Sequence, residues 1–371
     1  MLQIKLRQIR TKSALAIFIP FTVLMTGCDR DALFEQVQRF SASAEQLEKQ
    51  FPDLATDVYD SCLRTAEYTL IQASDEPFKN RINSQEKCIE PLVFDNEGLE
   101  VTVTKQEFEG ELIAVNDVIV NYLQALGTVA SNGEISYTEN VQGLGNAIAR
   151  VEPRLTEAEN QAGQKILEFI LGAYNNEFRQ ETLATEITVT NEPLQRYICL
   201  LKQDIVGQYL DAELQTEKEA VDEYYQAYIN RELEIDRTQQ NQQYLIQQYL
   251  HQELELEPLP EPTLATKPPF AVLKLDSQWR ETRAKVQQRE AAANNYIDVL
   301  NTIAGGHSQL DRQLGGSGKG QAELCPDEAK GSLVYKDFPP VMTDESNESD
   351  PVEIATKYAD RLELLVAKEN N

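Results

Sequence analysis

Few side chains in this chain of 371 residues are of the kinds that catalyse reactions or bind metals, since it has only two His, five Cys and one Trp. His251 lies in Gln-rich sequence, and His307 directly follows Gly305 and Gly306. Neither belongs to a motif that would hold it against a metal ion or beside a nucleophile. Such a His is usually a surface residue or caps a helix. We therefore predict no catalytic residue and no metal site.

Two stretches are superficially like ligand-binding loops. In residues 315–320 (GGSGKG), Lys319 is followed by Gly320 and not by the Ser or Thr whose hydroxyl holds Mg²⁺ in a phosphate-binding loop, so we interpret the stretch as a flexible linker. The densest acidic cluster lacks the central Gly of an EF-hand loop, so we interpret it as a solvated loop and expect at most weak Ca²⁺ binding. Its residues are Asp344, Glu345, Glu348 and Asp350.

Carboxylates are the abundant reactive type, with 61 Asp and Glu against 34 Lys and Arg. Paired carboxylates can hydrolyse glycosidic bonds, but among so many acids chance pairs abound and no pair can be nominated. The formal net charge of −27 argues against nucleic acid as a partner, because phosphate binding needs a basic face and the only dense basic run precedes residue 13. Basic partners are favoured instead, although a solvated acidic surface is the commoner explanation.

The first residues carry a signal for export. Four cations and no acid precede the apolar run from Ala14 to Met25, and Thr26, Gly27 and Cys28 follow it. An apolar run of about 12 residues is too short to span a membrane as a mature helix, and small residues after it suit cleavage by a signal peptidase.

Residues 24–28 (LMTGC) resemble the lipobox of bacterial lipoproteins, with Met25 where Leu is usual. The resemblance implies that residues 1–27 are removed and that Cys28 carries a diacylglycerol and acyl chains such as palmitate. These chains would anchor an acidic body to the bacterial cell membrane, and we expect no other cofactor. Asp29 resembles an inner-membrane retention signal, but this rule varies and the choice between inner and outer membrane stays open. An ordinary secretory signal and a short membrane anchor are the alternatives.

Export would place the other four Cys in a compartment that permits disulfides. Three pairings exist. We favour Cys62 with Cys88, because the turn-like residues 73–77 between them suggest a hairpin. Cys199 with Cys325 follows by elimination, and the alternative is that Cys199 is a buried thiol.

Helical periodicity dominates the remaining sequence. It predicts helices over 31–51, over 53–72 with Pro52 in the first turn, and over 156–175, while 99–103 alternates like a short strand. The clearest pattern is a heptad seam, which predicts coiled-coil packing against a partner helix. Its members are Phe108, Leu112, Val115, Ile119, Tyr122, Leu126 and Val129.

The longest predicted helix begins at Pro193 and continues to about Glu255. Its Gln-rich run at 239–248 weakens the apolar stripe and suggests a break or a protruding arm. Residues 257–269 contain five Pro and form a stiff connector. A helix over 276–304 then returns along the long one and ends at Gly305 and Gly306.

The predicted fold is all-α, an elongated antiparallel bundle of long helices with at most a short strand near 99–103. The predicted parts are a signal peptide (1–27), an N-terminal helical hairpin region with a disulfide (28–106), a long-helix bundle (107–312), a flexible loop (313–350) and a C-terminal helix (351–371).

We expect a lipid-anchored, non-enzymatic scaffold or adaptor that contacts another envelope protein. An envelope enzyme acting on peptidoglycan or another glycan through paired carboxylates and a ligand-binding lipoprotein are the alternatives. Tyr224, Tyr225 and Tyr228 are candidate interaction residues, although a core stripe is the simpler interpretation. Arg64 and Tyr68 are expected to brace the disulfide at Cys62.

Overall fold

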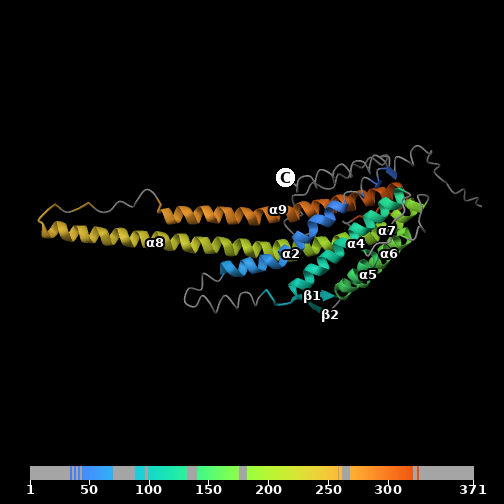
Figure 1. Cartoon of the computed structure of the whole chain (residues 1–371), viewed down its shortest axis with the longest axis horizontal. Helices are drawn as coiled ribbons and strands as arrows, with labels where there is room; N and C mark the ends of the chain where they lie inside the picture. The colour runs from blue at the N-terminus through green and yellow to red at the C-terminus, as the bar shows by residue number, and fades with distance from the viewer. Residues whose placement is uncertain are drawn as a thin grey trace, which may run out of the picture.

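A computed structural model shows an elongated molecule, with a helical body at one end and a long arm at the other (Figure 1). The signal peptide, Cys28, the acidic cluster at 344–350 and the predicted C-terminal helix lie outside the residues that the structure describes. The described residues are 34–35, 37–38, 41, 44–69, 88–96, 99–131, 140–174, 182–257, 259–260, 268–320 and 324–325.

Helices make up 87 % of the described residues, which confirms the all-α class. The only sheet in the described residues is a hairpin of β1 (Leu92–Asn96) and β2 (Leu99–Val103). The strand expected at 99–103 is therefore present, with a partner that was not predicted. The helical elements are α2 (Ala44–Thr69), α4 (Lys105–Ser131), α5 (Asn140–Val151), the 3-10 turn η1 (Glu152–Arg154), α6 (Glu157–Tyr174), α7 (Leu183–Asp204), the π-helix η3 (Ile205–Leu214), α8 (Gln215–Glu253) and α9 (Phe270–Gln313).

Helix α4 is the centre of the body. All seven residues of the predicted heptad seam are buried. They face several helices instead of one, because α4 packs against α2, α5, α6 and α7. Among the described helices, α4 alone is long and apolar enough to cross a membrane, and 67 % of its most apolar stretch is buried inside the body. Its hydrophobicity is thus accounted for by its central position.

Two prolines that were predicted to mark helix starts lie inside helices. Helix α2 continues through Pro52, and the long helix begins at Leu183 and passes through Pro193. The predicted break after residue 51 and the predicted start at 193 are therefore wrong. Phe51, on one side of Pro52, and Leu194, next to Pro193, are fully buried, and this burial offsets the hydrogen bond that each proline removes.

The predicted end of the last long helix is also wrong. Helix α9 continues through Gly305 and Gly306 to Gln313. Tertiary contacts hold the helix here, because Ile303 and Leu310 are fully buried and the side-chain amide of Gln195 on α7 donates a 2.7 Å hydrogen bond to the carbonyl oxygen of Ala304. The helix ends where Gly315 adopts a φ of +91° and the next amide bonds back to the carbonyl oxygen of Asp311, as in a Schellman motif.

Helices α7, η3 and α8 form one continuous helix of 71 residues, and α9 returns antiparallel to it. Beyond the body, α8 and α9 form the arm, which Figure 1 shows projecting away from α2, α4, α5 and α6. The protruding arm is one of the two outcomes that the Gln-rich run suggested.

Two disulfides join distant parts of the chain. Cys62 of α2 pairs with Cys88, and Cys199 of α7 pairs with Cys325. This is the pairing that the sequence favoured, and the alternative of a free Cys199 thiol is not what the structure contains.

Candidate interaction surface

The base of the arm is fixed to the body by a buried carboxylate. Glu217 of α8 is 1 % exposed and accepts hydrogen bonds from three partners. Ser61 Oγ lies 2.7 Å away, Arg64 Nε 2.9 Å away, and Arg289 Nη2 of α9 2.5 Å away. Two cations and a hydroxyl from α2 and α9 therefore surround this buried carboxylate, so Glu217 joins three helices. Arg64 therefore braces the junction of the arm with α2, a role that differs from the expected support of the disulfide.

A second carboxylate extends this junction into the π-helix. Tyr209 of η3 donates a 2.6 Å hydrogen bond to Asp57 of α2, and Asp57 also pairs with Arg64 at 2.8 Å and Arg289 at 3.4 Å. Burial raises the pKa of Asp57, although the tyrosine hydroxyl and the two cations oppose this effect. Burial and the neighbouring carboxylate also raise the pKa of Tyr209. The direction of the arm is thus set by a network and not only by apolar packing.

The predicted interaction tyrosines lie just beyond the junction. Tyr225 is 8 % exposed. Tyr224 contacts Tyr225 edge-on at 4.9 Å between ring centroids, and it also contacts Tyr228 at 4.8 Å and Tyr68 of α2 at 5.4 Å. The four rings form an aromatic cluster that packs α2 against α8. The core interpretation of these tyrosines therefore fits their position better than the interaction interpretation.

Polar pairs along the arm fix how α8 and α9 align. Trp279 Nε1 donates a 2.8 Å hydrogen bond to Asp222, Arg283 pairs with the same carboxylate at 3.4 Å, and Lys218 pairs with Glu290 at 3.1 Å. In this antiparallel alignment, the start of α9 lies roughly opposite residue 236 of α8. The last 17 or so residues of α8 therefore extend about 25 Å beyond α9, at 1.5 Å per residue.

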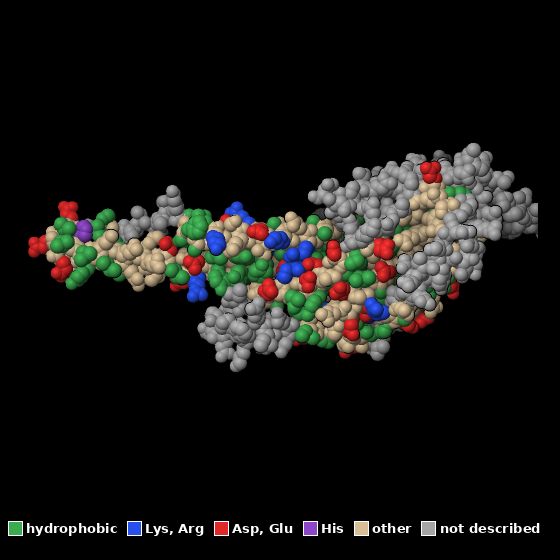
Figure 2. Space-filling view, in the orientation of Figure 1, with side chains coloured by type: hydrophobic (Ala, Val, Ile, Leu, Met, Phe, Trp, Pro, Cys, Tyr) green, Lys and Arg blue, Asp and Glu red, His purple; other side chains and the backbone are tan. Residues whose placement is uncertain are grey.

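Most of the large apolar side chains that are exposed in the described residues lie on the arm. Of the twelve large apolar side chains that are exposed in the described residues, nine lie on the arm. Figure 2 shows hydrophobic and acidic side chains together at its free end, with Lys and Arg only further along the arm. The nine are Ile235, Leu245, Ile246, Tyr249, Leu250, Leu254, Leu256, Phe270 and Leu273.

Sequence reasoning did not find this surface. The signal was available, because Leu245 and Ile246 in the Gln-rich run are followed four residues later by Tyr249 and Leu250. Without knowing where α9 begins, however, these residues could equally have been the buried stripe of the arm. Their exposed fractions, 51 to 62 %, distinguish the two cases.

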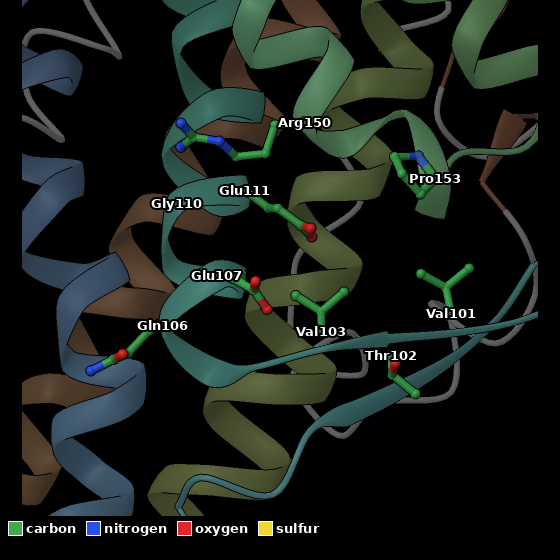
Figure 3. A pocket seen from close by; sticks show the side chains of 9 residues that line it. All are labelled: Val101, Thr102, Val103, Gln106, Glu107, Gly110, Glu111, Arg150 and Pro153. Atoms are coloured by element: carbon green, nitrogen blue, oxygen red, sulfur yellow. The ribbon is translucent and has the colours of Figure 1, made fainter.

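A cavity of about 490 Å³ lies on the body where β2 meets α4 and α5. Figure 3 shows Arg150 of α5 beside α4, with Glu107 and Glu111 projecting from α4 toward Val103 of β2. A Cβ atom on Gly110 would lie 2.9 Å from Nη1 of Arg150, so the glycine lets the guanidinium lie against the helix. The cavity thus combines a cation, two carboxylates and apolar side chains.

Both carboxylates that line this cavity make hydrogen bonds that stabilise the fold. Glu107 accepts a 2.9 Å hydrogen bond from the backbone N–H of Thr104 at the start of α4, which lowers the pKa of Glu107. Burial raises the pKa of Glu111, against the opposing effect of Arg154, whose Nε lies 2.5 Å away. Arg154 also pairs through both amino groups with Asp204. This is not the pair of substrate-facing acids that a glycan hydrolase requires.

His307 lies in the centre of the body, and not at the surface or a helix end as expected. It is fully buried between Tyr122, whose hydroxyl is 2.6 Å from Nε2, and Asn191, whose Oδ1 is 3.1 Å from Nδ1. The amide nitrogen of Asn191 donates to Asp311 and to the carbonyl oxygen of Lys319. Its Oδ1 is therefore an acceptor and can accept a hydrogen bond from Nδ1 of His307.

The glycine-rich residues 315–320 belong to this network. Ser308 Oγ donates to the carbonyl oxygen of Gly318, and the backbone N–H of Gly318 donates to Asp311, at 2.8 and 2.9 Å. These residues fold back on α9, in contrast to the flexible linker that was expected. A Cβ on Gly316 would lie 1.6 Å from Oδ1 of Asp311, so close packing explains the glycine there.

His251 lies at the tip, where its Nδ1 is 2.9 Å from the carbonyl oxygen of Glu257. In the part of the chain that the structure describes, no group of three or more His, Cys, Asp and Glu side chains could hold a metal ion. A scan against models of protein families, a search of curated proteins and a search of solved structures each found no significant match.

Proposed function

We propose that this protein is a lipid-anchored, non-enzymatic scaffold or adaptor of the bacterial cell envelope, which holds a partner protein at a distance from the membrane. The signal sequence and the lipobox-like residues ending in Cys28 support the anchor. The observation that carries the adaptor role is the arm, a projection with exposed apolar side chains at its far end (Figures 1 and 2).

The construction of the arm supports a mechanical role. Its base is fixed by Glu217, Asp57 and the cations around them, and its shaft by Trp279 and the ion pairs along it. Exposed apolar area costs free energy in water, and contiguous patches of it usually mark interaction sites. A fixed base would hold the apolar tip in a defined position, where a partner protein could bind it.

The anchor is tested by replacing Cys28 with Ser. The wild-type chain should fractionate with membranes and carry the mass of a diacylglycerol and an acyl chain, and the variant should lose both. Recovery of the unmodified wild-type chain in the soluble fraction would refute the anchor.

The adaptor role is tested by photocrosslinking in intact cells. A photoreactive residue at position 246 of the tip should give a discrete crosslinked product, and the same residue at position 189, an exposed apolar position on α7, should not. Equal crosslinking from both positions, or none from either, would contradict the role.

Ligand binding is the second candidate function, because the cavity at Arg150 could accept a small ligand with an anionic group. Replacing Gly110 with Leu would displace the guanidinium of Arg150 from its position against α4. A screen of small carboxylates against both forms, read by thermal shift, should show stabilisation of the wild type only. The absence of any stabilising carboxylate would exclude this candidate for that ligand class.

A further inference from the structure

We propose that the tip of α8 docks a basic amphipathic helix of a partner protein, which packs on the exposed stripe where α9 is absent and so continues the two-helix arm. The proposal rests on the adaptor function and specifies the partner's chemistry. The stripe consists of Leu245, Ile246, Tyr249 and Leu250, and we refer to it as the tip stripe.

The tip stripe occupies one face of the helix. At about 100° per residue, its four members lie within an arc of about 140° whose centre is opposite Tyr244. Tyr244 and His251 are on the other face, where they bond to the carbonyl oxygens of Leu259 and Glu257. Glu257 and Leu259 therefore lie against the face that the tip stripe does not use, and the four side chains of the stripe are exposed.

The geometry of the stripe fits a helix. Its residues follow at i, i+1, i+4 and i+5, the spacing by which one helix packs into the grooves of another. Nearer the body, the same helix is already paired with α9. Beyond residue 236, about 25 Å of α8 remains without that pairing, which is long enough for about four helical turns of a second helix.

The acidic charge of the tip indicates which charged residues should flank the apolar face of the partner helix. From residue 238 to residue 266 the chain has no Lys or Arg, and its acids include Glu253, Glu255 and Glu257. An anionic membrane surface would be repelled by these acids, and so would the tip of a second copy of the chain. A helix with an apolar face flanked by Lys or Arg would be attracted, and this is the occupant that the surface favours.

The test uses the full-length protein in phosphatidylcholine nanodiscs and two synthetic helical peptides of 21 residues. Both peptides have Leu and Ile at the heptad core positions, and they differ only in flanking Lys or Glu. Fluorescence anisotropy should show binding of the Lys peptide that weakens as salt is raised, and no binding of the Glu peptide. If the chain is not acylated, the same titration is done in solution, so a failure of the anchor and a failure of docking are read separately.

Variants separate docking from general attraction to an acidic protein. Changing all four residues of the tip stripe to Gln leaves the charge unchanged, and it should weaken binding of the Lys peptide at least about tenfold. The matched control changes exposed apolar residues of the body, Ile89 and Val189, to Gln and should bind like the wild type. Circular dichroism should show that both variants remain folded, because the replaced side chains are exposed.

Four results would overturn the proposal. The first is equal binding of the Lys peptide to the wild type and the stripe variant. The second is equal binding of both peptides. The third is a concentration-dependent dimer in sedimentation that the stripe variant loses, which would assign the surface to a second copy. The fourth is stripe-dependent flotation with phosphatidylglycerol vesicles, which would assign it to a membrane.

Discussion

Replacing His307 with Gln should change how the stability of the body depends on pH. Burial lowers the pKa of His307 to about 3 from its usual value of 6.5. Between these values the unfolded chain binds more protons than the folded chain, so His307 makes the protein less stable as the pH falls from about 6.5 towards 3. From pH 7 to pH 4 this single side chain should remove about 3 kcal/mol from the free energy of unfolding.

Gln is neutral throughout this range, so the variant lacks the effect. At pH 7 it should be about 1 to 3 kcal/mol less stable than the wild type, because it cannot satisfy both Tyr122 and Asn191. At pH 4 the difference should disappear or reverse. Urea titrations followed by circular dichroism, at pH 7, 5.5 and 4 and constant ionic strength, measure both quantities. A constant difference at the three pH values would refute the reasoning.

A second buried group, Asp117, changes the stability with pH in the opposite direction to His307, so a control variant is needed. Burial raises the pKa of Asp117 to about 6, so between about pH 6 and 3.8 the folded chain binds more protons and gains stability on acidification. This effect opposes that of His307, and the wild type alone would show only their sum. Asp117→Asn should therefore shift the pH dependence in the direction opposite to His307→Gln.

Three further predictions concern the body. Gly163→Ala should lower the stability of the body by about 1 to 3 kcal/mol, because the new Cβ would lie 2.1 Å from the hydroxyl of Tyr197. The control Gly145→Ala should not, because its Cβ would meet nothing within 4 Å. Thermal melts compare the two variants. Arg154→Met should cost about 3 to 5 kcal/mol at pH 7, because it leaves buried Glu111 and Asp204 without this cation. Part of the loss should be recovered on acidification, because burial raises the pKa of Glu111 and the variant lacks the opposing effect of Arg154. A urea midpoint unchanged at pH 7 would contradict this. Cys88→Ser should cost about 3 to 4 kcal/mol, because the disulfide closes a loop of 26 residues, and urea titration of the unreduced variant measures the loss.

Periodicity was sufficient to predict the class of the fold and much of its plan. The buried stripe of α4 and the returning long helix follow from which residues are apolar and how they are spaced. The disulfide pairing was predicted from the turn-like sequence between Cys62 and Cys88, with Cys199 and Cys325 paired by elimination. The anchor at Cys28 depends on sequence alone and stays a prediction.

Local rules failed where burial outweighed them. Pro52 and Pro193 were read as helix starts and Gly305 as a helix end, because each has that local preference. A local conformational preference of about 1 to 3 kcal/mol is overcome when the burial of neighbouring large side chains contributes as much stabilisation. Where those neighbours pack is a long-range property that no local window contains.

The amino-acid sequence by itself determined that this chain forms long antiparallel helices with a strongly acidic surface, because composition and spacing act within a few residues. Only the tertiary structure decided that His307 is buried, that Glu217 joins three helices, and that α8 outreaches α9 and leaves the tip stripe open. Each of these depends on which helices meet and in what alignment, and such contacts join residues more than 50 positions apart.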